Sequence, residues 1–177
     1  FYVIAAGVLG VVLIPVLSEH MVKNDRRGVW ALSNSLMNLM ALIMFGIGII
    51  IFIFAGQLMH IVAPNLSPDQ LHNATTIMRF ISFNPLFFTL AGILTSTQQV
   101  FGRFFFFAIS PIVYNLSIIA SIYIFKDSLG LIGLGAGALI GAVLQFGVAA
   151  IGVLGLNFHW RPKIDFKSTD FWRILRQ

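Results

Sequence analysis

The chain has 177 residues, of which 58% are apolar and only 10% are charged, and its mean hydropathy is +0.93. A soluble domain carries roughly 25% charged residues, so this composition excludes an ordinary water-soluble enzyme. The absence of cysteine excludes disulfides, thiolate metal sites and thiol catalysis, and the net charge of +5 comes from bases beside apolar segments, which argues against nucleic-acid binding.

Long apolar stretches separated by polar loops predict an all-α fold, a polytopic membrane helix bundle. A helix needs about 20 apolar residues to cross about 30 Å of hydrocarbon. We expect five transmembrane helices within residues 1–157, over residues 1–18, 31–61, 80–102, 104–125 and 129–156.

The first expected helix carries Pro15 near its end, and a polar loop follows over residues 19–28. The stretch at residues 63–76 follows the second expected helix and contains two prolines and two asparagines. We interpret it as an exposed loop that opens with a short surface turn.

The third expected helix is the uncharged stretch between Arg79 and Arg103. As a helix it would rise about 34 Å, close to one bilayer crossing. The fourth is expected to kink or begin near Pro111, and a tight turn at residues 126–130 leads to the fifth.

A basic tail follows at residues 158–177. Ser168 or Thr169 would cap a short amphipathic helix whose apolar side carries Phe171, Ile174 and Leu175. We expect this helix to lie at the membrane interface. Because the chain begins within an apolar run and ends on such a helix, we interpret it as a fragment of a longer protein.

The bases are distributed unevenly between the alternate loops, and the side of a membrane that carries more Lys and Arg is the cytoplasmic side. Nine of the eleven fall on one side: Lys23, Arg26, Arg27, Arg103, Arg161, Lys163, Lys167, Arg173 and Arg176. Arg79 and Lys126 fall on the other. The tail is therefore predicted to be cytoplasmic.

Two expected helices carry stripes of small and polar residues at helical spacing. The stripe of the third comprises Ser82, Pro85, Thr89, Gly92, Ser96 and Gln99, and that of the fourth comprises Ser110, Tyr114, Ser117 and Ser121 beside Asn115. Asn34, Asn38 and Gln145 are further polar residues in apolar surroundings. Interhelical hydrogen bonding and the wall of a hydrated cavity both explain such residues. On the second interpretation the substrate cavity would be lined by Asn38, Ser82, Thr89, Ser96, Gln99, Tyr114, Asn115, Ser117 and Gln145.

The remaining patterns favour helix packing over chemistry. Gly133, Gly137 and Gly141 form one face on which another helix can approach closely. No acid or base lies at the centre of an expected helix, which argues against a proton pump or voltage sensor. No two of the four histidines have the spacing of metal ligands, so we expect neither a metal nor a cofactor, and no enzyme motif is present.

Four sequence segments, in order along the chain, resemble the MviN/MurJ family of lipid II flippases. They are AAGVLGVVLIPVLSEHMVK (residues 5–23), LMHIVAPNLSPDQL (58–71), QQVFGRFFFFAISPIVYNLSII (98–119) and GALIGAVLQF (137–146). The positions that carry the resemblance are Gly7, Pro15, Glu19, Pro64, Gly102, Arg103, Phe104, Pro111, Asn115, Gly141 and Gln145.

The resemblance implies helices two to six of a fourteen-helix protein of the bacterial inner membrane, and hence most of one six-helix lobe. It implies a lipid II flippase for cell wall biogenesis, working by alternating access between two lobes, with lipid II, membrane lipids and the remaining helices as partners. In the family the substrate-binding arginines lie in helices one, two and eight. Helices one and eight are absent from this sequence, and Phe1 and Tyr2, near the position of a family arginine, are apolar, so no such arginine is carried over. Ala6 stands where some relatives have an acid. The alternatives are another exporter of the same superfamily, for polysaccharides or drugs, and a membrane scaffold that does not transport.

Overall fold

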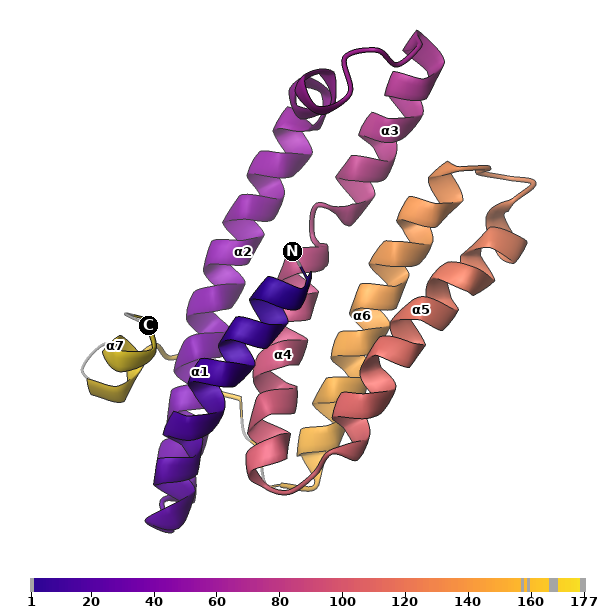
Figure 1. Cartoon of the computed structure of the whole chain (residues 1–177). Helices are drawn as coiled ribbons and strands as arrows, with labels where there is room; N and C mark the ends of the chain where they lie inside the picture. Colours follow the sequence, from indigo (N-terminus) through magenta and orange to yellow (C-terminus); the bar gives the residue numbers. More distant parts are fainter. Residues whose placement is uncertain (1, 157, 159, 166–168, 176–177) are drawn as a thin grey trace.

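The computed structural model of the chain describes residues 2–156, 158, 160–165 and 169–175. These residues form an all-α bundle without a strand (Figure 1). Its helices are α1 (Tyr2–Val22), α2 (Arg26–Val62), α3 (Pro68–Ile81), α4 (Asn84–Val100), α5 (Phe105–Phe125), α6 (Ile132–Leu154) and α7 (Thr169–Leu175).

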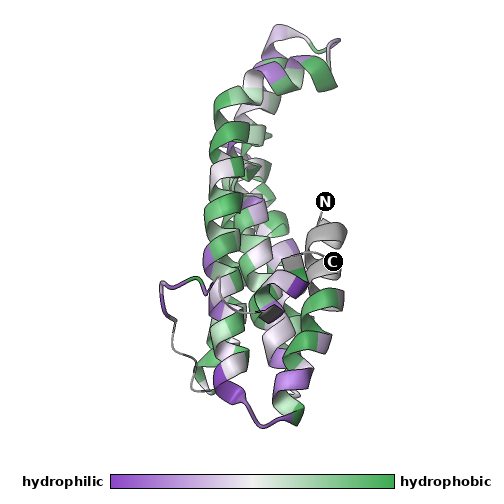
Figure 2. Cartoon of the chain, turned by 90° about the vertical axis from the view of Figure 1, so that its left-hand side faces the viewer, coloured by the Kyte–Doolittle hydropathy of each residue, from purple (hydrophilic) through white to green (hydrophobic). Residues whose placement is uncertain are grey.

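Four helical stretches among the described residues are long and apolar enough to cross a membrane: α2, α3 with α4, α5 and α6. Residues Val12–Val22 of α1 add a shorter apolar stretch. Apolar residues run along the long helices, and hydrophilic residues gather near their ends and in the loops (Figure 2). Large apolar side chains such as Ile50, Ile53 and Phe54 of α2 are exposed, as expected for a surface that contacts lipid.

Two helices extend beyond their expected ends. We expected the second helix to begin at residue 31, but α2 begins at Arg26, because the Asp25 carboxylate caps it by accepting a hydrogen bond of 2.9 Å from the Gly28 N–H. We expected the first helix to stop at residue 18, but α1 continues past Pro15 to Val22. The polar loop between them is therefore shorter than expected.

The prediction of an exposed loop at residues 63–76 is wrong over its second half, because α3 begins at Pro68. Ser67 is its N-cap. The Ser67 Oγ accepts a hydrogen bond from the Gln70 N–H, and the Gln70 Oε1 accepts one from the Ser67 N–H at 3.1 Å. This reciprocal capping box, with Pro68 in the first helical turn, starts the helix where the prolines had indicated a loop.

The expected helix at residues 80–102 is interrupted, and α4 begins only at Asn84. Pro85 has no N–H to donate to the preceding turn, so the ladder of helical hydrogen bonds is interrupted here. The Phe83 ring packs against Gly48 of α2, where an added Cβ would lie 2.8 Å from the Phe83 Cδ1. The break is therefore held in place by a close contact with α2.

The glycines of α6 permit close packing against α5, as the sequence predicts. An added Cβ on Gly137 would collide with the Ser121 hydroxyl, and one on Gly141 would lie 3.0 Å from the Tyr114 carbonyl oxygen. On the other side of α6, α4 packs against both α6 and α1, so α4 lies centrally in the bundle.

Candidate functional site

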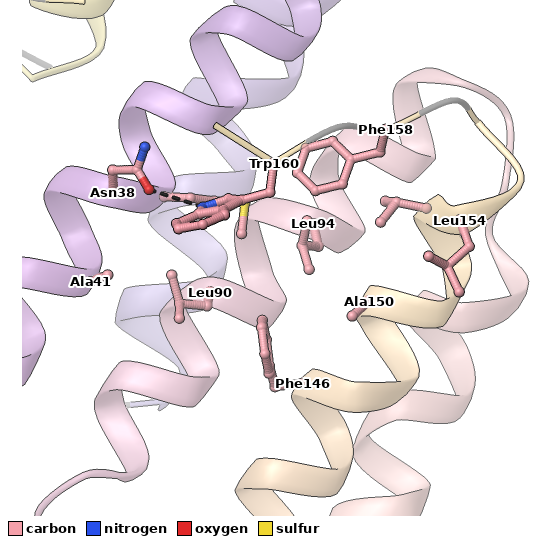
Figure 3. A pocket seen from close by; sticks show the side chains of 11 residues that line it. Asn38, Ala41, Leu90, Leu94, Phe146, Ala150, Leu154, Phe158 and Trp160 are labelled. Carbon is pink, nitrogen blue, oxygen red and sulfur yellow. Dashed lines mark hydrogen bonds between the residues drawn. The ribbon is translucent and has the colours of Figure 1, made fainter. Parts of the chain in front are cut away.

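A groove of about 590 Å³ lies between α2, α4 and α6, and residues that follow α6 close one side of it (Figure 3). We call it the α2–α4–α6 groove. It is lined by Met37, Asn38, Ala41, Leu90, Leu94, Phe146, Ala150, Val153, Leu154, Phe158 and Trp160. Nearly all of these side chains are apolar, so the groove suits an apolar ligand.

A strap of residues 160–165 is bound to α2 by hydrogen bonds. The Asn38 Nδ2 donates to the Arg161 carbonyl oxygen at 2.7 Å and to the Lys163 carbonyl oxygen at 3.0 Å. The Trp160 Nε1 donates to the Asn38 Oδ1 at 3.0 Å (Figure 3). Asn38 thus uses both amide hydrogens and one acceptor site to hold the strap.

Two neighbours of Asn38 on α2 extend this contact. The Arg161 N–H donates to the Asn34 Oδ1 at 3.3 Å, and the Asp165 N–H donates to the Ser35 Oγ at 3.1 Å. The polar residues of α2 therefore bind the backbone of an extended segment more than 120 positions away in the sequence. Of the residues predicted to line a substrate cavity, Asn38 alone lies in the groove lining.

The α7 helix is docked against α1 and α2. Phe171 is 0% exposed and Ile174 is 6% exposed, and both belong to the apolar core of the bundle. Their apolar side is therefore covered by the neighbouring helices, and the place of α7 at the membrane interface stays a prediction. We expected Leu175 on the same apolar side and Ser168 as a possible cap. The Leu175 side chain and residue Ser168 lie outside the described part of the chain.

Charged side chains reinforce this docking. The Arg173 Nη1 donates to the Glu19 Oε2 at 3.1 Å, and the His20 Nε2 lies 3.1 Å from the Asp170 Oδ2. The His20 Nδ1 also lies 3.0 Å from the Asp25 Oδ2. Hydrogen bonds from the Gly28 N–H and from His20 lower the pKa of Asp25 below its usual value.

The polar stripe predicted for the third helix lies in the break before α4 and along α4, and three of its members are buried. Ser82, Thr89 and Ser96 are all buried, and the Thr89 Oγ1 has no hydrogen-bond partner among the described residues. The Gln99 Nε2 donates to the Thr95 carbonyl oxygen of its own helix. Water access to this stripe in another conformation stays a prediction.

Interhelical bonds of α4 come from residues that sequence reasoning missed. The Gln98 Nε2 donates to the Ala149 carbonyl oxygen of α6 at 2.7 Å. The Ser33 and Thr97 hydroxyls lie 3.0 Å apart across the α2–α4 contact. Gln98 and Thr97 adjoin the predicted stripe, but one residue rotates a side chain by about 100° around a helix. Helical spacing was enough to select residues next to Gln98 and Thr97, but it could not predict the hydrogen-bond partners of these two residues.

The polar residues of α5 and α6 lie mainly in the contact between those helices. Tyr114 and Ser117 pack around Gly141, and the Tyr114 ring meets the Phe88 ring edge-on at 5.0 Å. Gln145 is buried. Asn115 is exposed, and its Nδ2 donates to the Pro111 carbonyl oxygen one turn earlier. These positions are distributed over different faces, so the described conformation does not bring them together with Asn38.

The remaining positions of the family resemblance lie at helix ends, in turns or within helices. Gly7 and Pro15 lie in α1, Pro64 lies between α2 and α3, and Phe104 precedes α5. Gly102 has a φ of +75°, a conformation that suits glycine. The Arg103 Nη2 donates to the Gly155 carbonyl oxygen at 3.5 Å, which connects the ends of α4 and α6.

Among the described residues, no group of three His, Cys, Asp or Glu side chains could hold a metal ion. Membrane-length apolar helices, with polar residues in the contacts between them, define the chain as a polytopic α-helical membrane protein. A family model described as "Lipid II flippase MurJ" matches residues 1–177. The chain therefore belongs to the lipid II flippase MurJ family.

Two curated relatives carry the name "Probable lipid II flippase MurJ". The protein of Borreliella burgdorferi is 26% identical over 127 residues, which cover 72% of this chain and 25% of the relative. The protein of Buchnera aphidicola subsp. Schizaphis graminum is 23% identical over 179 residues, which cover 99% of this chain and 35% of the relative. The chain thus spans about a quarter to a third of the length of the relatives that it matches.

Proposed function

We propose that the chain is part of a transporter that moves lipid II from the inner to the outer leaflet of the bacterial cytoplasmic membrane. The match of the family model along residues 1–177 carries this proposal. In this proposal the chain supplies helices two to six of a fourteen-helix protein, as the resemblance implies. The chain would then form most of one lobe, and alternating access would require the second lobe.

The distribution of bases supports an orientation with the tail in the cytoplasm, because nine of eleven bases fall on one side of the expected topology. A diphosphate head group needs cationic partners, preferably forked arginines, in a region of low dielectric constant. In the proposed arrangement other helices of the same protein supply those arginines. The bound partners are then lipid II, membrane lipids and the remaining helices.

The proposal is tested in cells depleted of their own lipid II flippase. The full-length gene that contains this sequence should restore growth and the arrival of lipid II at the outer leaflet, measured by access of an externally added lipid II-cleaving enzyme. Residues 1–177 alone should not restore either. Export of a polysaccharide precursor instead of lipid II by the full-length protein would favour the other exporters of the superfamily. Rescue by the fragment would contradict the requirement for two lobes.

A further inference from the structure

We infer that the α2–α4–α6 groove holds one acyl chain of an anionic glycerophospholipid, whose phosphate is bound by Arg161 and Lys163 of the strap. This site is distinct from the transport cycle proposed above. It depends on the groove, on the strap that closes one side of it, and on the charge of the residues that follow Trp160.

The interior of the groove offers water almost no partner. Its polar side-chain groups belong to Asn38 and Trp160, which bond to each other and to the strap backbone. A cavity without available polar groups stays dry and binds apolar ligands. The volume of about 590 Å³ lies within the range of pockets that hold small ligands. An acyl chain is the apolar ligand that a membrane supplies in greatest abundance.

The strap brings positive charge next to this apolar groove. Asn38 lines the groove and bonds to the carbonyl oxygens of both Arg161 and Lys163, so the backbone of both bases adjoins the groove. Both residues are exposed, and neither has a carboxylate partner within the described part of the chain. Basic residues beside a pocket between transmembrane helices are the arrangement that recognises anionic lipid head groups.

The strap favours a phospholipid over a lipid-linked diphosphate. Both exposed bases lie on a single extended segment beside the groove. A diphosphate carries more charge, and its desolvation calls for forked donors that converge from several helices. Trp160, which lines the groove, directly precedes Arg161 and is 58% exposed, is a residue type enriched where membrane meets water.

The test uses the full-length protein in phosphatidylcholine nanodiscs, with brominated phospholipids as quenchers of tryptophan fluorescence. The Trp160 signal is the difference between the parent protein and Trp160→Phe. Brominated phosphatidylglycerol should quench this signal at about a 25-fold lower mole fraction than brominated phosphatidylcholine, since each of the two bases contributes about a fivefold factor near an anionic lipid. The double variant Arg161→Gln/Lys163→Gln should remove the preference. Arg79→Gln/Lys126→Gln, which neutralises the two bases predicted to lie on the other side of the membrane, should preserve it.

A second variant tests the groove itself. Ala150→Phe fills part of the lining and should weaken quenching by both lipids; if it fails to fold, the double variant at exposed positions still decides the head-group preference. Equal quenching by the two lipids, or a preference that survives Arg161→Gln/Lys163→Gln, would overturn the inference. The inference would also be overturned if undecaprenyl diphosphate relieved the quenching and added unbrominated phosphatidylglycerol did not. That result would assign the groove to the lipid-linked substrate. Failure of the full-length gene to move lipid II, with lipid preference intact, would contradict only the proposed function.

Discussion

Asn38 is the residue on which the strap depends. Replacing it by leucine removes one acceptor and two donor hydrogens, which leaves the Arg161 and Lys163 carbonyl oxygens to water. We expect Asn38→Leu to destabilise the full-length protein by about 1–3 kcal/mol and to speed proteolysis within the strap, because it removes three hydrogen bonds that contribute up to about 1 kcal/mol each. Asn115→Leu is the matched control, since Asn115 bonds only within its own helix. Equal cleavage of the strap in both variants would show that Asn38 does not hold it.

Asp25 should make stability depend on pH. Its folded-state pKa is lowered from 3.8, first by the Gly28 N–H and next by His20. A lowered pKa stabilises the folded state above the unfolded pKa, and this stabilisation is lost as the pH falls through the folded value. Asp25→Ala should therefore lower the Tm at neutral pH, and the gap to the parent should shrink only below about pH 4. Asp127→Ala removes the same charge from a turn and should leave stability within about 0.5 kcal/mol. A gap that stays constant down to the acid limit of folding would argue against the cap.

For single residues, the sequence predicted which residue types form hydrogen bonds better than it predicted their partners. Asn38 could be selected because an amide in an apolar helix requires hydrogen bonds. Its partners at Trp160 and Arg161 follow only from the path of the chain after α6. The same limit applies to Gln98, whose contact with Ala149 depends on the rotation of α4 against α6.

The contact between α5 and α6 depends on the absence of side chains at its glycines. Gly141→Leu should force the helices apart, because an added Cβ already lies 3.0 Å from the Tyr114 carbonyl oxygen. We expect a loss of about 1–3 kcal/mol, the usual cost of overpacking, measured as the midpoint of unfolding in mixed detergent. Gly147→Leu makes the same change in the same helix, where nothing lies within 4 Å of an added Cβ, and should be tolerated. Equal losses would mean that the close contact at Gly141 does not decide the effect.

The helices could largely be predicted from the length of the apolar stretches and from the spacing of the glycines, but the residues at which they begin and end could not. The sequence signal for the start of α3 was present in Ser67 and Gln70, three positions apart, yet the neighbouring prolines favoured a loop. The break before Asn84 depends on Pro85 together with the packing of Phe83 on Gly48. Proline in a membrane helix permits either a kink or a break, so packing against α2 decides the outcome.

For the whole molecule, the proposed orientation predicts which loops face the cytoplasm. With single cysteines in a full-length background free of other reactive thiols, Asn65→Cys between α2 and α3 should react with a membrane-impermeant reagent in intact cells. Lys23→Cys, between α1 and α2, should react only after permeabilisation, because the positive-inside rule places that loop in the cytoplasm. Both positions are exposed, so a difference in labelling reports sidedness and not burial. Labelling of Lys23→Cys in intact cells would reverse the topology.

The burial pattern makes one end of the bundle stiffer than the other. Buried residues of α2 concentrate between Val29 and Met37, whereas α3, beside the far end of α2, contains no buried residue. Segments with few buried contacts open at the lowest free energy, so amide hydrogen exchange should be faster in α3 than in α4. A small tilt of α2 at its tightly packed end would then produce a larger displacement at its far end. The flexibility needed to separate helices is thus located at the end of the bundle that contains α3, where the fewest contacts must break.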